Sequence, residues 1–218
     1  MKIALDFGHG FGDSGAIGNG KREDLIVREI GERVKTYLDK ENHQTKIVSL
    51  DGGLTSRTNL ANKWGADLYV SIHMNSNSGT PATGTEVYVY NSTSKAKPFA
   101  ERIVNNISGL GYKNRGVKTA NFAVLRGSSM PALLIECCFI NNSDDMNKLN
   151  FDKMALAISE GILNKKINNT PAAEKPDTIQ PEGVYRVICG SYKDKQNALN
   201  IQKQLQEKGF PSFLEFKK

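Results

Sequence analysis

The strongest constraint on the fold is an alternation of short apolar runs with segments of helical periodicity, which begins at the first residues. Residues 2–6 (KIALD) have the composition of a buried strand. Residues 23–39 follow, and their apolar side chains recur at helical spacing, at Leu25, Ile26, Ile30, Val34 and Leu38. Strands that alternate with helices predict an α/β domain with a twisted, mostly parallel sheet flanked by helices on both faces.

The same alternation continues to about residue 165. We predict further strands at residues 45–50, 66–73, 84–90, 120–125 and 132–136, and further helices at residues 54–64, 94–107 and 151–164. Residues 84–90 (GTEVYVY) alternate between polar and apolar side chains, which is typical of a half-exposed edge strand.

The composition changes after this domain. Residues 166–183 contain three prolines and no apolar periodicity, as linkers do. Residues 184–218 then predict a small βαβ segment, with strands at 184–191 and 210–216 around a helix at 195–208. We therefore predict a domain at residues 1–165, a linker at 166–183 and a segment at 184–218 that is smaller than most domains that fold alone.

The composition excludes several classes of protein. With 39% hydrophobic and 24% charged residues, the 218-residue chain is globular, and no apolar stretch approaches the ~18 residues that cross a bilayer. The first apolar run is too short for a secretory signal, so we expect synthesis in the cytoplasm without membrane insertion. A net charge of +6 favours polyanionic partners. The sequence lacks a helix with a stripe of basic residues, so we do not expect nucleic acid to be the partner.

Three predicted strands lead into residues that could bind a metal. Asp6 and His9 follow the first strand, His73 ends the third and Glu136 ends the last of the domain. Because ligand sites in open α/β sheets lie at the carboxyl ends of the strands, these side chains are expected to converge. Two imidazoles with one carboxylate and an open fourth position form a catalytic zinc site. Asp6 either orients His9 or only ends its strand.

The identity of the carboxylate is open at this point. Glu23 and Asp24 start a helix, where each is either a ligand or only a favourable charge at the helix N-terminus. Glu136 lies in an apolar run, where burying a carboxylate is costly without a partner. It is either a general base, a fourth metal ligand or the partner of Arg126.

Cysteines are poor candidates for this site. Cys137 and Cys138 are adjacent in a predicted strand, so their side chains point to opposite faces and cannot both bind one ion. We interpret them as buried apolar side chains.

Four motifs together resemble the zinc-dependent N-acetylmuramoyl-L-alanine amidases of the type 3 family. They are GHGFGDSGA (8–16), the acidic helix start at Glu23, RTNLANKWGADLYVSIHMN (57–75) and VLRGSSMPALLIECCFINN (124–142). The resemblance covers residues 1 to about 165 in order and spacing. It implies that His9, Glu23 and His73 hold Zn²⁺, with Glu23 preferred to Asp24, and that Glu136 is catalytic. Arg126 is a candidate for holding the substrate or the developing oxyanion.

This resemblance implies a function. The family hydrolyses the peptidoglycan amide between the lactyl group of N-acetylmuramic acid and L-alanine. Residues 185–216 resemble the first half of a SPOR-type peptidoglycan-binding repeat, which implies binding to the wall. Because only half of the repeat is matched, pairing of two such segments would complete one module, and this implies self-association as one alternative. A phage endolysin that lyses the wall after its release from the cytoplasm fits these features, and a fragment of a bacterial autolysin is the other origin. The alternative functions are a zinc metallopeptidase that cuts the stem peptide and a catalytically dead wall-binding protein.

The sequence departs from the family pattern near the first strand. Phe7 stands where the family commonly has proline. We expect this difference to change the packing and not the chemistry.

Overall fold

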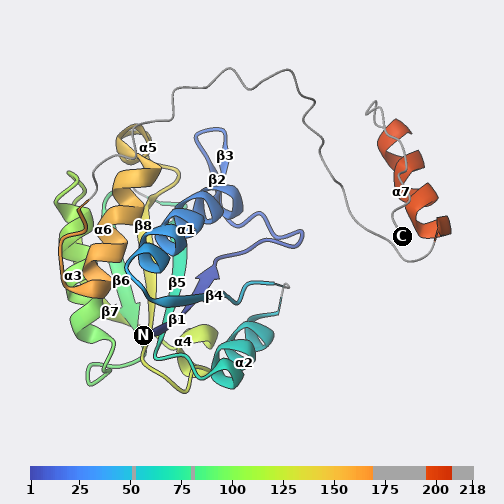
Figure 1. Cartoon of the computed structure of the whole chain (residues 1–218). Helices are drawn as coiled ribbons and strands as arrows, with labels where there is room; N and C mark the ends of the chain where they lie inside the picture. Colours follow the sequence, from blue (N-terminus) through green and yellow to red (C-terminus); the bar gives the residue numbers. More distant parts are fainter. Residues whose placement is uncertain (51–52, 80–81, 169–194, 208–218) are drawn as a thin grey trace. The chain divides into compact units, whose positions relative to one another are not determined.

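The computed structural model describes residues 1–50, 53–79, 82–168 and 195–207. The chain forms two compact units, Met1–Asn168 and Asn169–Lys218 (Figure 1). In the second unit, the described residues form helix α7 (Lys195–Glu207), at the place predicted for a helix. The two strands predicted around it lie outside the described residues. The proposed division into 1–165, 166–183 and 184–218 stays a prediction.

A mixed sheet forms the centre of the first unit. Within the described residues it has six strands in the order β4-β1-β5-β8-β6-β7. These are β4 (Gln44–Ile47), β1 (Lys2–Phe7), β5 (Leu68–Asn75), β8 (Ala132–Phe139), β6 (Thr85–Val89) and β7 (Asn114–Thr119). The first four are parallel to one another, β6 is antiparallel to β8, and β7 is parallel to β6. A small antiparallel hairpin, β2 (Ile17–Gly18) and β3 (Lys21–Arg22), precedes the first helix.

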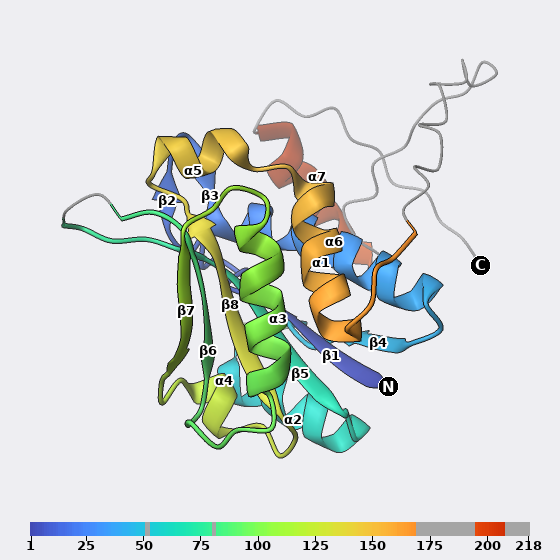
Figure 2. The same ribbon diagram turned by 90° about the vertical axis from the view of Figure 1, so that its left-hand side faces the viewer.

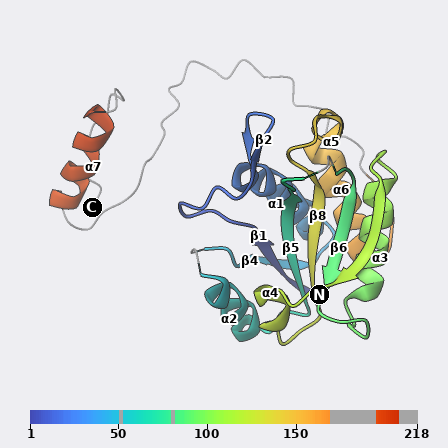
Figure 3. The same cartoon turned by 180° about the vertical axis from the view of Figure 1, so that it is seen from behind.

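Helices cover both faces of the sheet, as the sequence predicts. One face carries α1 (Glu23–Lys40), α3 (Lys97–Ser108) and α6 (Phe151–Leu163) (Figure 2). The opposite face carries α2 (Leu54–Trp64) and the short α4 (Ala123–Arg126) (Figure 3). Helix α5 (Ser143–Lys148) follows β8. No helix among the described residues is long and apolar enough to span a bilayer.

Two predictions about the sheet edge are wrong. Residues 120–125 are not a strand, because α4 begins at Ala123, and the edge strand is β7 just before it. A short apolar run such as AVLR does not distinguish a helix from a strand, and the polar sequence of β7 (NRGVKT) gives no strand signal. Consequently β6, predicted as a half-exposed edge, lies between β8 and β7 and is mostly buried.

The strands that carry His73 and Glu136 are longer than predicted. β5 continues to Asn75 and β8 continues to Phe139. His73 and Glu136 are direct neighbours in the parallel register of these two strands. Both residues therefore lie within their strands, near the carboxyl ends, and not beyond them.

Phe7 determines how closely α1 approaches the sheet. Its side chain is buried at the end of β1. A Cβ atom added to Gly31, in the middle of α1, would lie 2.1 Å from Cε1 of Phe7. The ring therefore occupies the space that a side chain at position 31 would need, so Phe7 contributes to the packing of α1 on the sheet.

We expect the substitution Gly31→Ala to lower the free energy of unfolding by about 1–3 kcal/mol, because the added methyl group overpacks the core against Phe7. The intrinsic helix propensity favours alanine by ~1 kcal/mol, so it works in the opposite direction. Urea denaturation of the wild type and the variant measures the difference. The loss should shrink in a Phe7→Leu background, and a gain in stability in the wild-type background would contradict the packing argument.

Candidate active site

The loop at residues 8–15 brings His9 over the sheet, and two of its glycines leave the space that this requires. A Cβ atom at Gly8 would lie 2.4 Å from the His73 ring. Gly15 has φ +61°, and a Cβ atom there would lie 2.6 Å from both Glu23 Oε2 and His9 Cδ2. Side chains at either position would fill the space between the candidate ligands.

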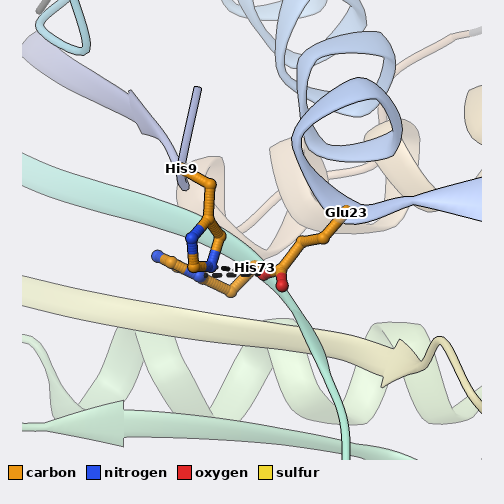
Figure 4. Close-up of side chains that lie close together, drawn as sticks. All are labelled: His9, Glu23 and His73. Atoms are coloured by element: carbon orange, nitrogen blue, oxygen red, sulfur yellow. Dashed lines mark hydrogen bonds and ion pairs between the residues drawn. The ribbon is translucent and has the colours of Figure 1, made fainter. Parts of the chain in front are cut away.

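His9, Glu23 and His73 come together from three elements (Figure 4). His9 lies in the loop after β1, Glu23 is the first residue of α1, and His73 lies in β5. Nε2 of His9 is 3.2 Å and Nδ1 of His73 is 3.0 Å from the same oxygen, Oε1 of Glu23. The two rings are edge to face, with centroids 5.0 Å apart. One ligand atom from each residue lies within 4.8 Å of the others.

Glu23 is buried and accepts hydrogen bonds from the backbone as well. Its Oε1 accepts from the N–H of Met74 at 2.9 Å, and its Oε2 accepts from the N–H of Ala16 at 2.9 Å. Burial alone would raise the pKa of Glu23, but the hydrogen bonds with His73 and His9 hold it well below its usual range. The carboxylate is therefore charged and oriented.

Asp24, the alternative ligand, points elsewhere. Its carboxylate accepts two hydrogen bonds from Arg22, at 3.0 and 2.8 Å. The structure thus brings Glu23, and not Asp24, to the two histidines.

His9 has its own acidic partner, Asp13. The Oδ2 atom of Asp13 lies 2.7 Å from Nδ1 of His9. Without a bound metal, the hydrogen bond to Glu23 is the main cause that raises the pKa of His9 to about 9. Burial works in the opposite direction, and the hydrogen bond to Asp13 adds to the increase. An acceptor on the second nitrogen also orients a histidine that binds a metal.

Asp6, which the sequence suggests as an acceptor that orients His9, instead pairs with Arg57, which binds the backbone of the loop. Its carboxylate pairs with Arg57 at 2.9 Å and accepts from the hydroxyl of Ser71 at 2.7 Å. Arg57 is buried and also donates to the carbonyl oxygens of Phe7, at 3.1 Å, and His9, at 2.7 Å. The buried ion pair therefore holds the backbone that carries His9.

The three side chains fit a zinc ion. Two nitrogens and one oxygen match the donor set of a catalytic site, in which ligand atoms of a tetrahedral zinc lie roughly 3.3 Å apart. The separations of 3.0 and 3.2 Å from Glu23 Oε1 are close to this value, and all three ligand atoms lie within 4.8 Å of one another. The side chains of His9 and His73 are 26% and 19% exposed, so the group is open to solvent on one side.

Glu136 lies beside this group without joining it. Its Oε2 atom is buried and has no hydrogen-bond partner among the described residues. Burial first, and then the charges of Glu23 and Glu86, raise the pKa of Glu136 to about 7, although His73 works against them. A carboxyl group with such a pKa can exchange a proton near neutral pH.

Arg126 is not the partner of Glu136. It is exposed at the end of α4, and its guanidinium donates to the carbonyl oxygen of Asn121 at 2.9 Å and to the side chain of Asn121 at 2.7 Å. Among the described residues, no hydrogen bond or ion pair joins Arg126 to the metal group. Its proposed contact with the substrate stays a prediction.

The cysteines are core residues, as expected. Both Cys137 and Cys138 are fully buried and free. Burial raises the pKa of the Cys137 thiol well above its usual range. In the described part of the chain, the group of possible metal ligands consists of His9, Glu23 and His73 and contains no thiol.

Two residues near the site were not found from the sequence. Asp13 follows His9 by four positions in the glycine-rich loop, a spacing that is uninformative without the loop geometry. Glu86 is buried beside Glu136 in the sheet, where the two are direct cross-strand neighbours. An acidic residue in an apolar run, as in GTEVYVY, is a signal that could have identified Glu86.

Comparisons with known proteins identify the family to which this chain is similar. Residues 3–169 match the family described as N-acetylmuramoyl-L-alanine amidase, and residues 163–217 match the SPOR domain. The sporulation-specific N-acetylmuramoyl-L-alanine amidase of Bacillus subtilis is 35% identical over 98% of this chain and 84% of its own length. The endolysin of Bacillus phage SPP1 is 34% identical over 85% of this chain and 74% of its own length.

Solved structures share the fold of the first unit. An N-acetylmuramoyl-L-alanine amidase from Clostridium difficile 630 aligns with a TM-score of 0.70 at 32% identity, over 75% of this chain and 95% of that one. The amidase AmiC2 of Nostoc punctiforme aligns with a TM-score of 0.69 at 35% identity, over 75% of this chain and 96% of that one. From its sequence, its fold and the match over residues 3–169, the chain belongs to the N-acetylmuramoyl-L-alanine amidase family of peptidoglycan hydrolases.

Proposed function

We propose that the protein cleaves the amide between the lactyl group of N-acetylmuramic acid and L-alanine with a zinc ion held by His9, Glu23 and His73. The observation that carries this proposal is the convergence of two imidazoles and a carboxylate beside the buried Glu136, whose Oε2 atom has no hydrogen-bond partner in the described part of the chain. When bound, zinc supplies a Lewis acid for the scissile carbonyl and lowers the pKa of a water molecule.

The residues around the ligands prepare them for this role. Asp13 holds the ring of His9 through Nδ1, so that Nε2 faces the shared site. The backbone N–H groups of Ala16 and Met74 hold the carboxylate of Glu23. Groups of the protein itself therefore orient His9 and Glu23.

Glu136 acts as the general base and then as the general acid. Its Oε2 atom, for which the described residues provide no hydrogen-bond partner, accepts a proton from the attacking water. The same atom then donates the proton to the amine nitrogen of L-alanine as the amide bond breaks. Arg126 is proposed to contact the substrate beyond this centre.

The second unit extends the proposal to binding of the wall. Its match to the SPOR domain supports peptidoglycan as its ligand. Endolysin-like lysis and synthesis in the cytoplasm before action at the wall also stay predictions, as does self-association.

End-group analysis of digested cell walls tests the proposed reaction. We expect the protein to release new N-terminal L-alanine without new reducing sugars, and a metal chelator should abolish the release. New N-termini other than L-alanine would instead indicate a metallopeptidase of the stem peptide. Binding to walls with no release would indicate a dead enzyme.

Zinc binding should release a proton. Because the pKa of His9 is about 9 in the metal-free protein, its imidazole is protonated at neutral pH and must lose that proton to bind metal. The apparent dissociation constant should fall roughly tenfold for each unit of rising pH below this pKa. Titration calorimetry in buffers of different ionisation enthalpy counts the protons, with His9→Ala as the control. Binding that is independent of pH would contradict the raised pKa of His9.

The substitution Glu136→Gln should keep zinc binding and lower kcat by roughly 10²–10⁴-fold, the contribution of general acid–base catalysis. Turnover on purified walls and the bound metal content, measured on the same sample, separate the two effects. The variant should be at least as stable as the wild type at pH 8, because the amide removes a buried carboxylate whose pKa is raised to about 7. Full activity would remove Glu136 from the mechanism.

A further inference from the structure

A row of polar side chains crosses the sheet from the metal group towards β7. His73 is the direct neighbour of Glu136, and Glu136 is the direct neighbour of Glu86. On the next strand, Lys118 pairs with Tyr88, two residues after Glu86. Cross-strand neighbours point to the same face, so the row continues from the candidate ligands to a cluster around Glu86.

Glu86 is buried at the centre of this cluster and is fully satisfied. Its Oε2 accepts from Nε of Arg115 at 2.6 Å and from Nζ of Lys118 at 2.5 Å. Its Oε1 accepts from Asn75 at 2.8 Å and from the hydroxyl of Tyr88 at 2.7 Å. Burial would raise the pKa of Glu86, but the hydrogen bonds from Lys118 and Arg115 hold it at about 2, so the group is a permanent anion.

The cluster has more positive than negative charge. Lys118 and Arg115 share the single charge of Glu86, which leaves a net charge of +1 on the three side chains. While Glu86 is buried, the side chains of Lys118 and Arg115 are 38% and 27% exposed. Arg115 donates to Glu86 through Nε. Among the described residues, no hydrogen bond or ion pair occupies its two terminal nitrogens.

Both cations are also held in position by aromatic rings. The guanidinium of Arg115 lies 5.0 Å from the centroid of Phe139, and the ammonium of Lys118 lies 5.9 Å from the centroid of Tyr88. Fixed, partly exposed cations with free donors are suited to bind a carboxylate, because little freedom is lost when the ligand arrives.

The position of the cluster matches the substrate of the proposed reaction. The strands of a sheet are about 4.8 Å apart, so β7 lies roughly 10 Å from β8 and roughly 14 Å from β5. An extended peptide spans this distance in about three or four residues. In Figure 3, α2 and α4 lie over one end of this face, and no described helix of the first unit passes over the other end of β5, β8 and β6. A stem peptide whose first amide lies at Glu136 can therefore extend towards β7.

We propose that Lys118 and Arg115, held by Glu86, bind a free carboxylate on the second or third residue of the stem peptide. The inference rests on the proposed function and adds a specificity determinant to it. Glu86 is a positioning residue in this scheme, because it does not itself face the ligand. The phosphates of a wall polymer are the other source of such an anion, and the position along the strand row favours the peptide.

Binding to a variant that does not turn over the substrate tests this inference. The probe is N-acetylmuramoyl-L-alanyl-D-isoglutamyl-L-lysine, compared with the same compound with both free carboxyl groups amidated. The full-length, zinc-loaded Glu136→Gln protein should bind the acid roughly tenfold more tightly than the amide, with a preference that weakens as salt rises. Calorimetry or fluorescence anisotropy gives both constants.

Substitutions then locate the selectivity. In Lys118→Met and Arg115→Met backgrounds, the ratio of the two affinities should fall towards one, whereas Lys118→Arg should retain a ratio above one. Lys153→Met is the matched control, because it removes an exposed positive charge on α6, on the opposite face of the sheet, and should keep the ratio.

The outcomes separate this inference from the proposed reaction. Equal affinity for acid and amide in the Glu136→Gln protein without further substitutions would overturn it. This comparison does not depend on whether the Lys118 and Arg115 variants fold. Competition by a glycerol-phosphate polymer without discrimination between the two peptides would assign the cations to wall phosphate and would also overturn it. If the Glu136→Gln protein prefers the acid but the wild type releases no L-alanine from walls, the proposed function fails and the carboxylate site stands.

Discussion

One buried carboxylate, that of Glu23, is the constraint on which the site depends. Its Oε1 atom contacts the rings of His9 and His73 and the backbone N–H of Met74. A buried charge without such partners would cost several kcal/mol, so the three segments that supply them must meet at the start of α1. Positions 8 and 15 need glycine for the same reason. A side chain at either position would lie between the groups that the carboxylate holds together.

The register of the sheet extends this constraint across the molecule. A shift of one residue between β5 and β8 would move Glu136 to the opposite face, among the apolar side chains beneath α1 and α6. In the observed register His73, Glu136 and Glu86 lie side by side. Of these three, Glu86 is paired with two cations, while one oxygen of Glu136 has no hydrogen-bond partner among the residues that the structure describes. The buried carboxyl oxygen without a partner, which destabilises the fold, therefore belongs to Glu136, the residue proposed to transfer the proton. Such a cost in stability is expected where function and stability conflict.

Much of the site could be predicted because it combines strong local signals. Histidines after glycine-rich or apolar segments, and a glutamate inside an apolar run, are unusual enough to identify His9, His73 and Glu136. The choice of Glu23 over Asp24 needed the family resemblance, and the structure explains it through the pairing of Asp24 with Arg22. Asp13 and Glu86 could not be assigned, because their partners are recognised only when the loop is closed and the strands are aligned.

The sequence by itself determined the α/β alternation, the helices that cover the sheet and the residue types of the candidate metal site, because periodicity and composition are local properties. Only the tertiary structure decided that β7 exists, that β6 is internal and that Asp6 holds Arg57 and not the ring of His9. These features depend on pairing between segments far apart in the chain. The polar segment 114–119 forms the edge strand β7 only because β6 provides hydrogen-bond partners for its backbone.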